Sequence, residues 1–122
     1  MIIKYFDYFL NLNGKEDEAV QIEDIQIFCK RSKIKWYQHA LERMQERDIS
    51  RADVKNCIMG GEIIEDYPDD FPHPSCLVFG YAVNNKIIHV VVSMDKENIG
   101  IITVYYPSTE KFESDLKTRK GR

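Results

Sequence analysis

Two adjacent glycines, Gly60 and Gly61, divide the sequence into two parts with different hydrophobic periodicities. Before them, apolar residues recur at intervals of three and four, which is the spacing of amphipathic helices. After them, β-branched and aromatic residues gather in short runs between turn residues, which is typical of strands. Glycine also supplies the left-handed geometry that ends many helices, so we expect a helix to stop here. Helices followed by strands predict an α+β domain.

The length of 122 residues fits one domain, with 43% hydrophobic and 30% charged residues as in ordinary globular proteins. We expect an N-terminal extension at residues 1–22, a single domain at 23–119 and a basic tail at 120–122. No run reaches the roughly 18 apolar residues of a membrane helix. The first residues lack a secretory cleavage signal. These features predict a cytoplasmic protein without a membrane partner.

The first part of the chain predicts helices that pack on a sheet. The expected helices cover residues 2–10, 23–32 and about 36–47. A brief extended link at 34–36 precedes the third of them. A further helix opens at Ser50, because Ser50 and Asp53 have the spacing of a capping box.

The second part predicts a four-stranded, mainly antiparallel sheet. The expected strands cover residues 62–67, 75–83, 86–94 and 99–106. A two-residue turn at Asn84–Asn85 joins two of them, because asparagine tolerates positive φ, and residues 96–98 form the next turn. Ser108 or Thr109 caps a final short helix.

One helix carries a ridge of cationic and titratable side chains. His39, Arg43 and Arg47 are four residues apart and therefore lie above one another along the border of its apolar stripe. Two stacked arginines cost an isolated helix about 0.2–0.5 kcal/mol, so an anion should offset them. A structural solution pairs Arg43 with Glu46 or with an acidic residue of the strand at 62–67. A functional solution is a phosphate, which guanidinium groups bind with fixed donors.

The surroundings of His89 depend on strand register. The Asn84–Asn85 turn places His89 opposite Gly80, which leaves room beside the imidazole. A three-residue second turn pairs His89 with Tyr105, whereas a four-residue turn pairs it with Val104 on the apolar face. We favour the first, because it gathers a polar strip. The strip comprises His89, Ser93, Thr103 and Tyr105.

The sequence favours neither a metal nor a cofactor. A metal site is an alternative that would use histidines and aspartates, but none of them has a recognised ligand spacing. These residues are His39, His73, His89, Asp66, Asp69 and Asp70. No phosphate-cradling glycine loop or dinucleotide motif is present. Three widely spaced cysteines indicate reduced core residues. The net charge of −3 argues against a generally basic nucleic-acid binder, although basic clusters form local patches.

The segment from His39 to Arg47 reads His-Ala-Leu-Glu-Arg-Met-Gln-Glu-Arg. The chain therefore resembles a bacterial family of unknown function recognised by the motif His-Ala-x-x-Arg-Met-x-x-Arg. Further matching segments follow in order, and the resemblance covers roughly residues 23–119. These segments are 61–68, 74–77, Gly80, 89–92 and 103–105. Asp48 stands where glycine is usual, and Phe112 where tryptophan is common.

Such proteins look like members of the barnase, EndoU, colicin and RelE-like (BECR) group of metal-independent ribonucleases, many of them toxins restrained by a small antitoxin. The resemblance implies attack of a ribose 2′-hydroxyl on the adjacent phosphate, with RNA as partner, either free mRNA or mRNA on the ribosome. It assigns proton transfer to His39 and His89, charge stabilisation to Arg43 and Arg47, and phosphate orientation or proton donation to Tyr105. The implied substrate-binding residues are Arg47, Tyr67 and Thr103. The alternative is a non-catalytic RNA- or protein-binding module of the same fold.

Overall fold

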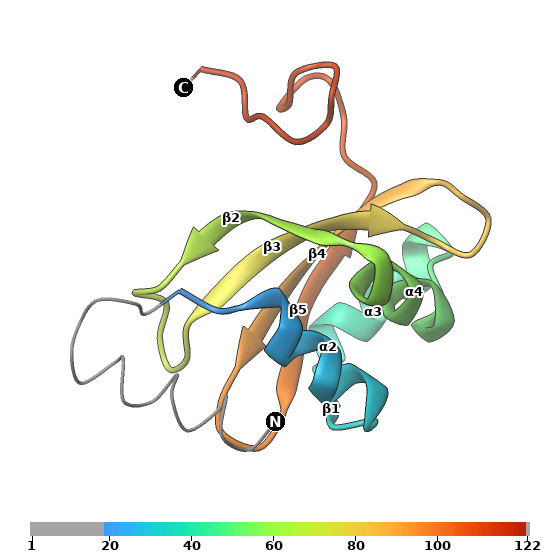
Figure 1. Ribbon diagram of the computed structural model, residues 1–122. Helices are drawn as coiled ribbons and strands as arrows, with labels where there is room; N and C mark the ends of the chain where they lie inside the picture. The colour runs from blue at the N-terminus through green and yellow to red at the C-terminus, as the bar shows by residue number, and fades with distance from the viewer. Residues whose placement is uncertain (1–18, 122) are drawn as a thin grey trace.

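The computed structural model describes residues 19–121 as three helices and five strands (Figure 1). The helices are α2 (Ile22–Lys30), α3 (Gln38–Arg47) and α4 (Arg51–Gly60). The strands are β1 (Ile34–Trp36), β2 (Glu62–Tyr67), β3 (Ser75–Tyr81), β4 (Ile87–Met94) and β5 (Ile99–Tyr105). The helix expected at residues 2–10 lies outside the described residues. No helix of residues 19–121 combines the length and apolar character needed to cross a bilayer.

The strands form one sheet in the order β1-β5-β4-β3-β2. β1 runs parallel to β5, and the other neighbours are antiparallel. The expected count of four strands was therefore wrong. The extended segment at 34–36 adds the fifth strand, because it pairs with β5 from Ile34 opposite Ile99 to Trp36 opposite Ile101. A three-residue segment is too short to display the alternation that identifies a strand in a sequence.

The three helices cover one face of the sheet, and the segment after β5 lies on the opposite face (Figure 1). The core between helices and sheet consists of apolar side chains without exposure. They include Ile25, Ala40, Val54, Val78, Val90 and Val104. Successive strand residues face opposite sides. Because Val90 faces the helices, His89 faces the opposite side of the sheet, which we call the open face.

Helix α4 begins as the sequence predicts. The Asp53 N–H donates to Ser50 Oγ over 3.0 Å, and the Ser50 N–H donates to Asp53 Oδ2 over 2.9 Å. The capping box is thus confirmed. Asp53 also accepts a hydrogen bond from the Val83 N–H at 2.9 Å, so this cap ties the helix to the β3–β4 turn.

The end of α4 differs from the expectation of a left-handed glycine. Gly61 has extended backbone, with φ −99° and ψ −176°. Glycine is needed there for another reason, since a Cβ would lie 2.4 Å from the Cys57 carbonyl oxygen and 2.6 Å from that of Phe79. Close packing of α4 on β3 therefore requires a residue without a Cβ at position 61.

The β3–β4 turn is one residue longer than the predicted Asn84–Asn85 turn. The Ala82 N–H donates to the Lys86 carbonyl over 2.8 Å, so three residues form the loop, and its last residue has φ 71°. The added residue shifts the register by one. His89 therefore lies opposite Phe79, and the expected pairing with Gly80 was wrong.

The β4–β5 hairpin uses both registers that the sequence left open. Next to the turn, Met94 pairs with Ile99, which corresponds to the four-residue turn. A bulge then adds Ile102 to β5 without a matching residue on β4. Beyond the bulge, His89 pairs with Tyr105, as favoured from the sequence. One extra residue thus returns the polar side chains to the open face.

The C-terminal helix expected from Ser108 is absent. Residues 108–121 form turns and an isolated antiparallel bridge between Phe112 and Arg119, and we call this segment the strap. Leu116 has φ 58°, which a right-handed helix does not allow. Asp115 accepts hydrogen bonds from the two backbone N–H groups at 117 and 118, which stabilises the turn. Phe112 and Leu116, whose four-residue spacing suggested one face of a helix, therefore belong to a folded loop.

Candidate functional site

The open face carries two cavities that meet on β5. The first, the basic cavity, measures about 390 Å³, and the second, the aromatic cavity, about 490 Å³. The basic cavity is lined by Arg47, Thr103, Tyr105, Lys111, Phe112 and Arg119, among others. The aromatic cavity is lined by Tyr37, His39, Phe71, His73, Ser93 and Ile102, among others. Ile102 and Thr103 are consecutive at the bulge of β5, where the alternation of faces is interrupted, so the cavities adjoin along β5.

Arg47 is positioned by the exposed edge of β5. The pairing of β1 with β5 ends at Ile101, so the later carbonyls on this edge have no partner strand. Arg47 Nη1 donates to the Val104 carbonyl over 2.7 Å. This bond anchors the guanidinium of α3 at the basic cavity beside Thr103 and Tyr105, so three predicted site residues come together here.

Within the part of the chain that the structure describes, two cations of the basic cavity are not paired with a carboxylate, so their charge is available to a ligand. Within residues 19–121, neither Arg47 nor Lys111 takes part in an ion pair. Arg119, in contrast, binds Glu65 through two hydrogen bonds, Nε to Oε2 at 3.0 Å and Nη2 to Oε1 at 3.1 Å. The cavity therefore has a positive potential that would favour an anion.

His89 lies behind the wall of the basic cavity and touches Tyr105. Its Nδ1 is 3.2 Å from the Tyr105 hydroxyl, and its Nε2 is 2.8 Å from the Leu116 carbonyl. A carbonyl only accepts hydrogen bonds, so Nε2 carries the proton, and Nδ1 of the neutral ring accepts the Tyr105 hydroxyl proton. His89 has 0% exposure, and burial lowers its pKa, which favours this neutral form.

The strap closes over His89. The Phe112 ring, 1% exposed, stands edge-on to the imidazole with centroids 4.7 Å apart. The Arg119 guanidinium lies over the same Phe112 ring at 4.7 Å. Burial raises the pKa of Tyr105, and this effect outweighs the opposing influence of the Arg119 guanidinium, while the nearby Glu65 carboxylate adds to it. Tyr105 is therefore held as a neutral hydroxyl at the cavity wall.

Tyr67 belongs to the support of Arg119. Its hydroxyl donates to Glu65 Oε1, and burial followed by this hydrogen bond raises the pKa of Tyr67 to about 12. The hydrogen bonds to Glu65 also raise the pKa of Arg119, which stays cationic. Thr103 lines the basic cavity, but Tyr67 does not. The structure thus places it beside the Glu65–Arg119 pair.

The ridge of α3 spans both cavities. Arg47 lines the basic cavity, while His39, exposed and two helical turns away, lines the aromatic cavity. Between them, Arg43 Nη1 binds the Glu46 carboxylate at 2.7 Å, which is one of the structural pairings expected from the sequence. His39 and His89 therefore do not share one cavity.

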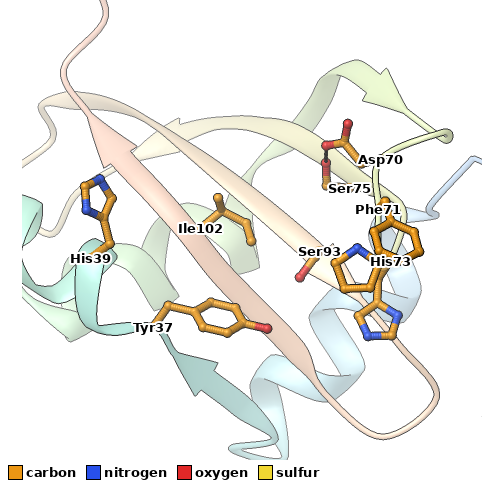
Figure 2. Close-up of a pocket in the computed structure, with 9 residues that line it drawn as sticks. Tyr37, His39, Asp70, Phe71, His73, Ser75, Ser93 and Ile102 are labelled. Atoms are coloured by element: carbon orange, nitrogen blue, oxygen red, sulfur yellow. Dashed lines mark hydrogen bonds between the residues drawn. The ribbon is translucent and has the colours of Figure 1, made fainter.

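Figure 2 shows how the aromatic cavity is built across the sheet. Tyr37 and His39 stand on one side, Phe71 and His73 on the other, and Ser93 and Ile102 lie between them. A Cβ at Gly100 would lie 2.8 Å from the Tyr37 ring and 2.7 Å from Ser93 Oγ. The glycine therefore lets the Tyr37 ring lie close to the open face.

The contributions of Lys111 and Arg119 were not predicted from the sequence, and Glu65 was expected to pair with a different cation. Glu65 pairs with Leu77 on β3, on the same face as His89, and is only 8% exposed, and a buried carboxylate signals a cationic partner. That partner was expected on α3, at Arg43. It comes instead from Arg119, which is 54 residues away in the sequence, because the strap folds back.

Among residues 19–121, no three His, Cys, Asp or Glu side chains gather as a metal-binding group. Cys29, Cys57 and Cys76 are buried and free, as the sequence predicts of reduced core residues. Burial raises the pKa of Cys57 to about 12, so its thiol stays protonated.

The fold is thus an α+β domain whose open sheet face bears adjoining basic and aromatic cavities. Residues 36–106 match the family model described as Domain of unknown function (DUF4258), and the chain belongs to this family. The match begins at Trp36, the last residue of β1, continues through α3 to β5 and ends just before the strap. No curated protein and no solved structure matched the chain.

Proposed function

We propose that this protein is a metal-independent RNA endonuclease of the barnase, EndoU and RelE-like group, and that it acts as the toxin of a toxin–antitoxin system in the cytoplasm. One observation carries the proposal. The Tyr105–His89 pair stands at a cavity that also holds the free cations Arg47 and Lys111. Cleavage of a phosphodiester needs both proton transfer and cationic stabilisation.

The hydrogen-bond directions favour His89, acting through Tyr105, as the base. The Tyr105 hydroxyl donates to His89 Nδ1, so its oxygen is free to accept a proton from the ribose 2′-hydroxyl as its own proton passes to His89. His89 would then act through Tyr105. Burial lowers the pKa of His89, whereas the hydrogen bond to the Leu116 carbonyl and the nearby Glu65 carboxylate raise it and so support the imidazolium.

The remaining steps use the α3 ridge. As the 2′-oxygen bonds to phosphorus, charge develops on the phosphate oxygens, and Arg47 and Lys111 of the basic cavity supply positive charge to stabilise it. Arg43, which lies one helical turn from Arg47 and pairs with Glu46, adds a smaller share. The bond from phosphorus to the 5′-oxygen breaks, and the leaving oxygen, on the side of the phosphate toward the aromatic cavity, takes a proton from His39. The products are a 2′,3′-cyclic phosphate and a free 5′-hydroxyl. Thr103 adds a hydroxyl that binds the phosphate.

The test is an RNA cleavage assay with and without a chelator. We expect chelator-resistant cleavage that leaves a cyclic phosphate. Tyr105→Phe removes the hydroxyl and keeps the ring, so it should lower the rate about 100-fold or more. Tyr81→Phe is the matched control, because Tyr81 is 46% exposed and lines neither cavity. Equal rates for Tyr105→Phe and the wild type would refute this mechanism.

The toxin role is tested in cells. Inducing the chain in bacteria should arrest growth and degrade RNA, and His39→Ala should relieve both effects. A small protein encoded next to it should restore growth when co-expressed. Unchanged growth on induction, with intact RNA, would contradict the toxin proposal.

A non-catalytic RNA-binding module is the second candidate, and one observation favours it. His89 is fully buried, and both of its ring nitrogens already have partners within the protein. On this alternative, RNA binds the basic cavity and is not cut, and Arg43→Lys is tolerated because charge alone matters. Salt-dependent binding without cleavage by the wild type would select it.

A further inference from the structure

We infer that the aromatic cavity is a nucleobase subsite, which holds a base of the RNA whose phosphate lies in the basic cavity. The inference rests on the proposed function, but it concerns a different set of residues. A base has two flat apolar faces and a polar edge. The aromatic cavity offers matching surfaces on its walls and its floor.

The walls carry two aromatic rings from distant parts of the chain. Phe71 belongs to the β2–β3 loop and is 94% exposed. Covering its apolar ring with a ligand would therefore be favourable. Tyr37 precedes α3 and is held against the open face by its close approach to Gly100. Figure 2 shows the two side chains on opposite sides of the cavity. An inserted base would lie between them or stack on Phe71.

The floor offers an unused hydroxyl group. Ser93 is only 8% exposed, and its side chain makes no hydrogen bond within the described residues. Ser75, also on the cavity wall, already donates its hydroxyl to Asp70. Ser93 is therefore the group that remains available to bind the polar edge of a base, with the imidazoles of His39 and His73 at the rim.

The position of the cavity favours RNA over other aromatic ligands. Ile102 lines the aromatic cavity and Thr103 the basic cavity, so a ligand spanning both has an aromatic part next to an anionic part. A nucleotide has this composition. A neutral apolar ligand would fill the aromatic cavity and leave the charges of Arg47 and Lys111 unused.

The experiment measures the contribution of the base to binding. The probe is a short, fluorescently labelled 2′-O-methyl oligonucleotide, which lacks the attacking hydroxyl, compared by anisotropy with an abasic strand of equal length. The wild type should bind the strand with bases more tightly. Phe71→Ala should weaken that binding roughly 5- to 150-fold, the range for loss of one stacking aromatic, and leave abasic binding unchanged.

Two further variants separate stacking from loss of structure. Phe71→Trp should restore binding, because it keeps an aromatic face. Tyr81→Ala, which removes an exposed ring outside both cavities, should bind like the wild type. Since Phe71 is almost fully exposed, its replacement should leave the thermal unfolding temperature unchanged.

The outcomes distinguish the inference from the proposed function. If Phe71→Ala binds both strands like the wild type, the subsite is refuted, even where RNA cleavage persists. If Phe71→Ala weakens binding only of the strand with bases and the wild type does not cut RNA, the subsite is supported and the nuclease proposal fails. If the wild type binds neither strand, or binds the abasic strand as tightly as the strand with bases, the inference is overturned.

Discussion

His89 and Tyr105 lie opposite each other on β4 and β5, and the Tyr105 hydroxyl donates to His89 Nδ1 at 3.2 Å. The pair exists because the bulge at Ile102 corrects the register that the β4–β5 turn sets. With the turn register alone, Val104 would face His89, and an apolar residue would replace the phenol. A single inserted residue thus determines whether the histidine has a polar partner.

The buried imidazole should make stability depend on pH. Burial lowers the pKa of His89 in the folded protein from its ordinary value of 6.5, so below that pH the unfolded chain binds a proton that the folded protein does not bind. The free energy of unfolding should therefore fall as pH drops below 6.5. Its slope from this group approaches about 1.4 kcal/mol per pH unit.

Urea denaturation between about pH 5 and 8 checks this dependence. His89→Gln should be less stable throughout but show a smaller loss on acidification than the wild type. His73→Gln is the control, because His73 lies on the β2–β3 loop outside the His89 cluster. An unchanged slope in His89→Gln would contradict the assignment of a buried neutral imidazole.

Removing the cation from the Glu65–Arg119 pair should destabilise the protein. Glu65 is 8% exposed, so Arg119→Gln leaves a buried carboxylate short of donors, at a penalty of about 1–3 kcal/mol. Adding Glu65→Gln to this variant should recover part of the loss. Lys117→Gln, which breaks the more exposed pair with Glu62, should change stability little. Additive effects of the two substitutions would show that the pair is not coupled.

The two glycines at the end of α4 should differ in their tolerance of alanine. At Gly60 a Cβ meets nothing within 4 Å, so Gly60→Ala should be neutral or stabilise by up to about 1 kcal/mol. At Gly61 a Cβ would collide with two carbonyl oxygens, so Gly61→Ala should lower the unfolding temperature clearly. Thermal denaturation of both variants tests the contrast, and equal tolerance would contradict the close packing of α4 on β3.

Arg47 should contribute to the salt dependence of RNA binding. Each phosphate contact to a single strand contributes about 0.7 to the slope of log affinity against log salt concentration. Arg47→Gln should reduce the slope by about this amount. Arg51→Gln is the matched control, because Arg51 packs on Trp36 and lines neither cavity. A slope equal to that of the wild type would place the phosphate elsewhere.

Helices α2 to α4 and the four longer strands were predictable because their signals are local. The capping box of Ser50 and Asp53 operates within one turn of helix, so residue spacing identifies it. The ridge of His39, Arg43 and Arg47 follows from helical geometry, as do its cationic character and the internal pairing of Arg43.

The sequence by itself thus determined the α+β class, the helix starts, the strand segments and the candidate residues. The tertiary structure alone decided the fifth strand, both hairpin registers and the division of His39 and His89 between two cavities. It also brought Lys111 and Arg119 to the site by folding the strap over the open face. The physical reason is that periodicity reflects neighbours along the chain. Register and long-range pairing depend instead on turn length, a bulge and contacts between distant residues.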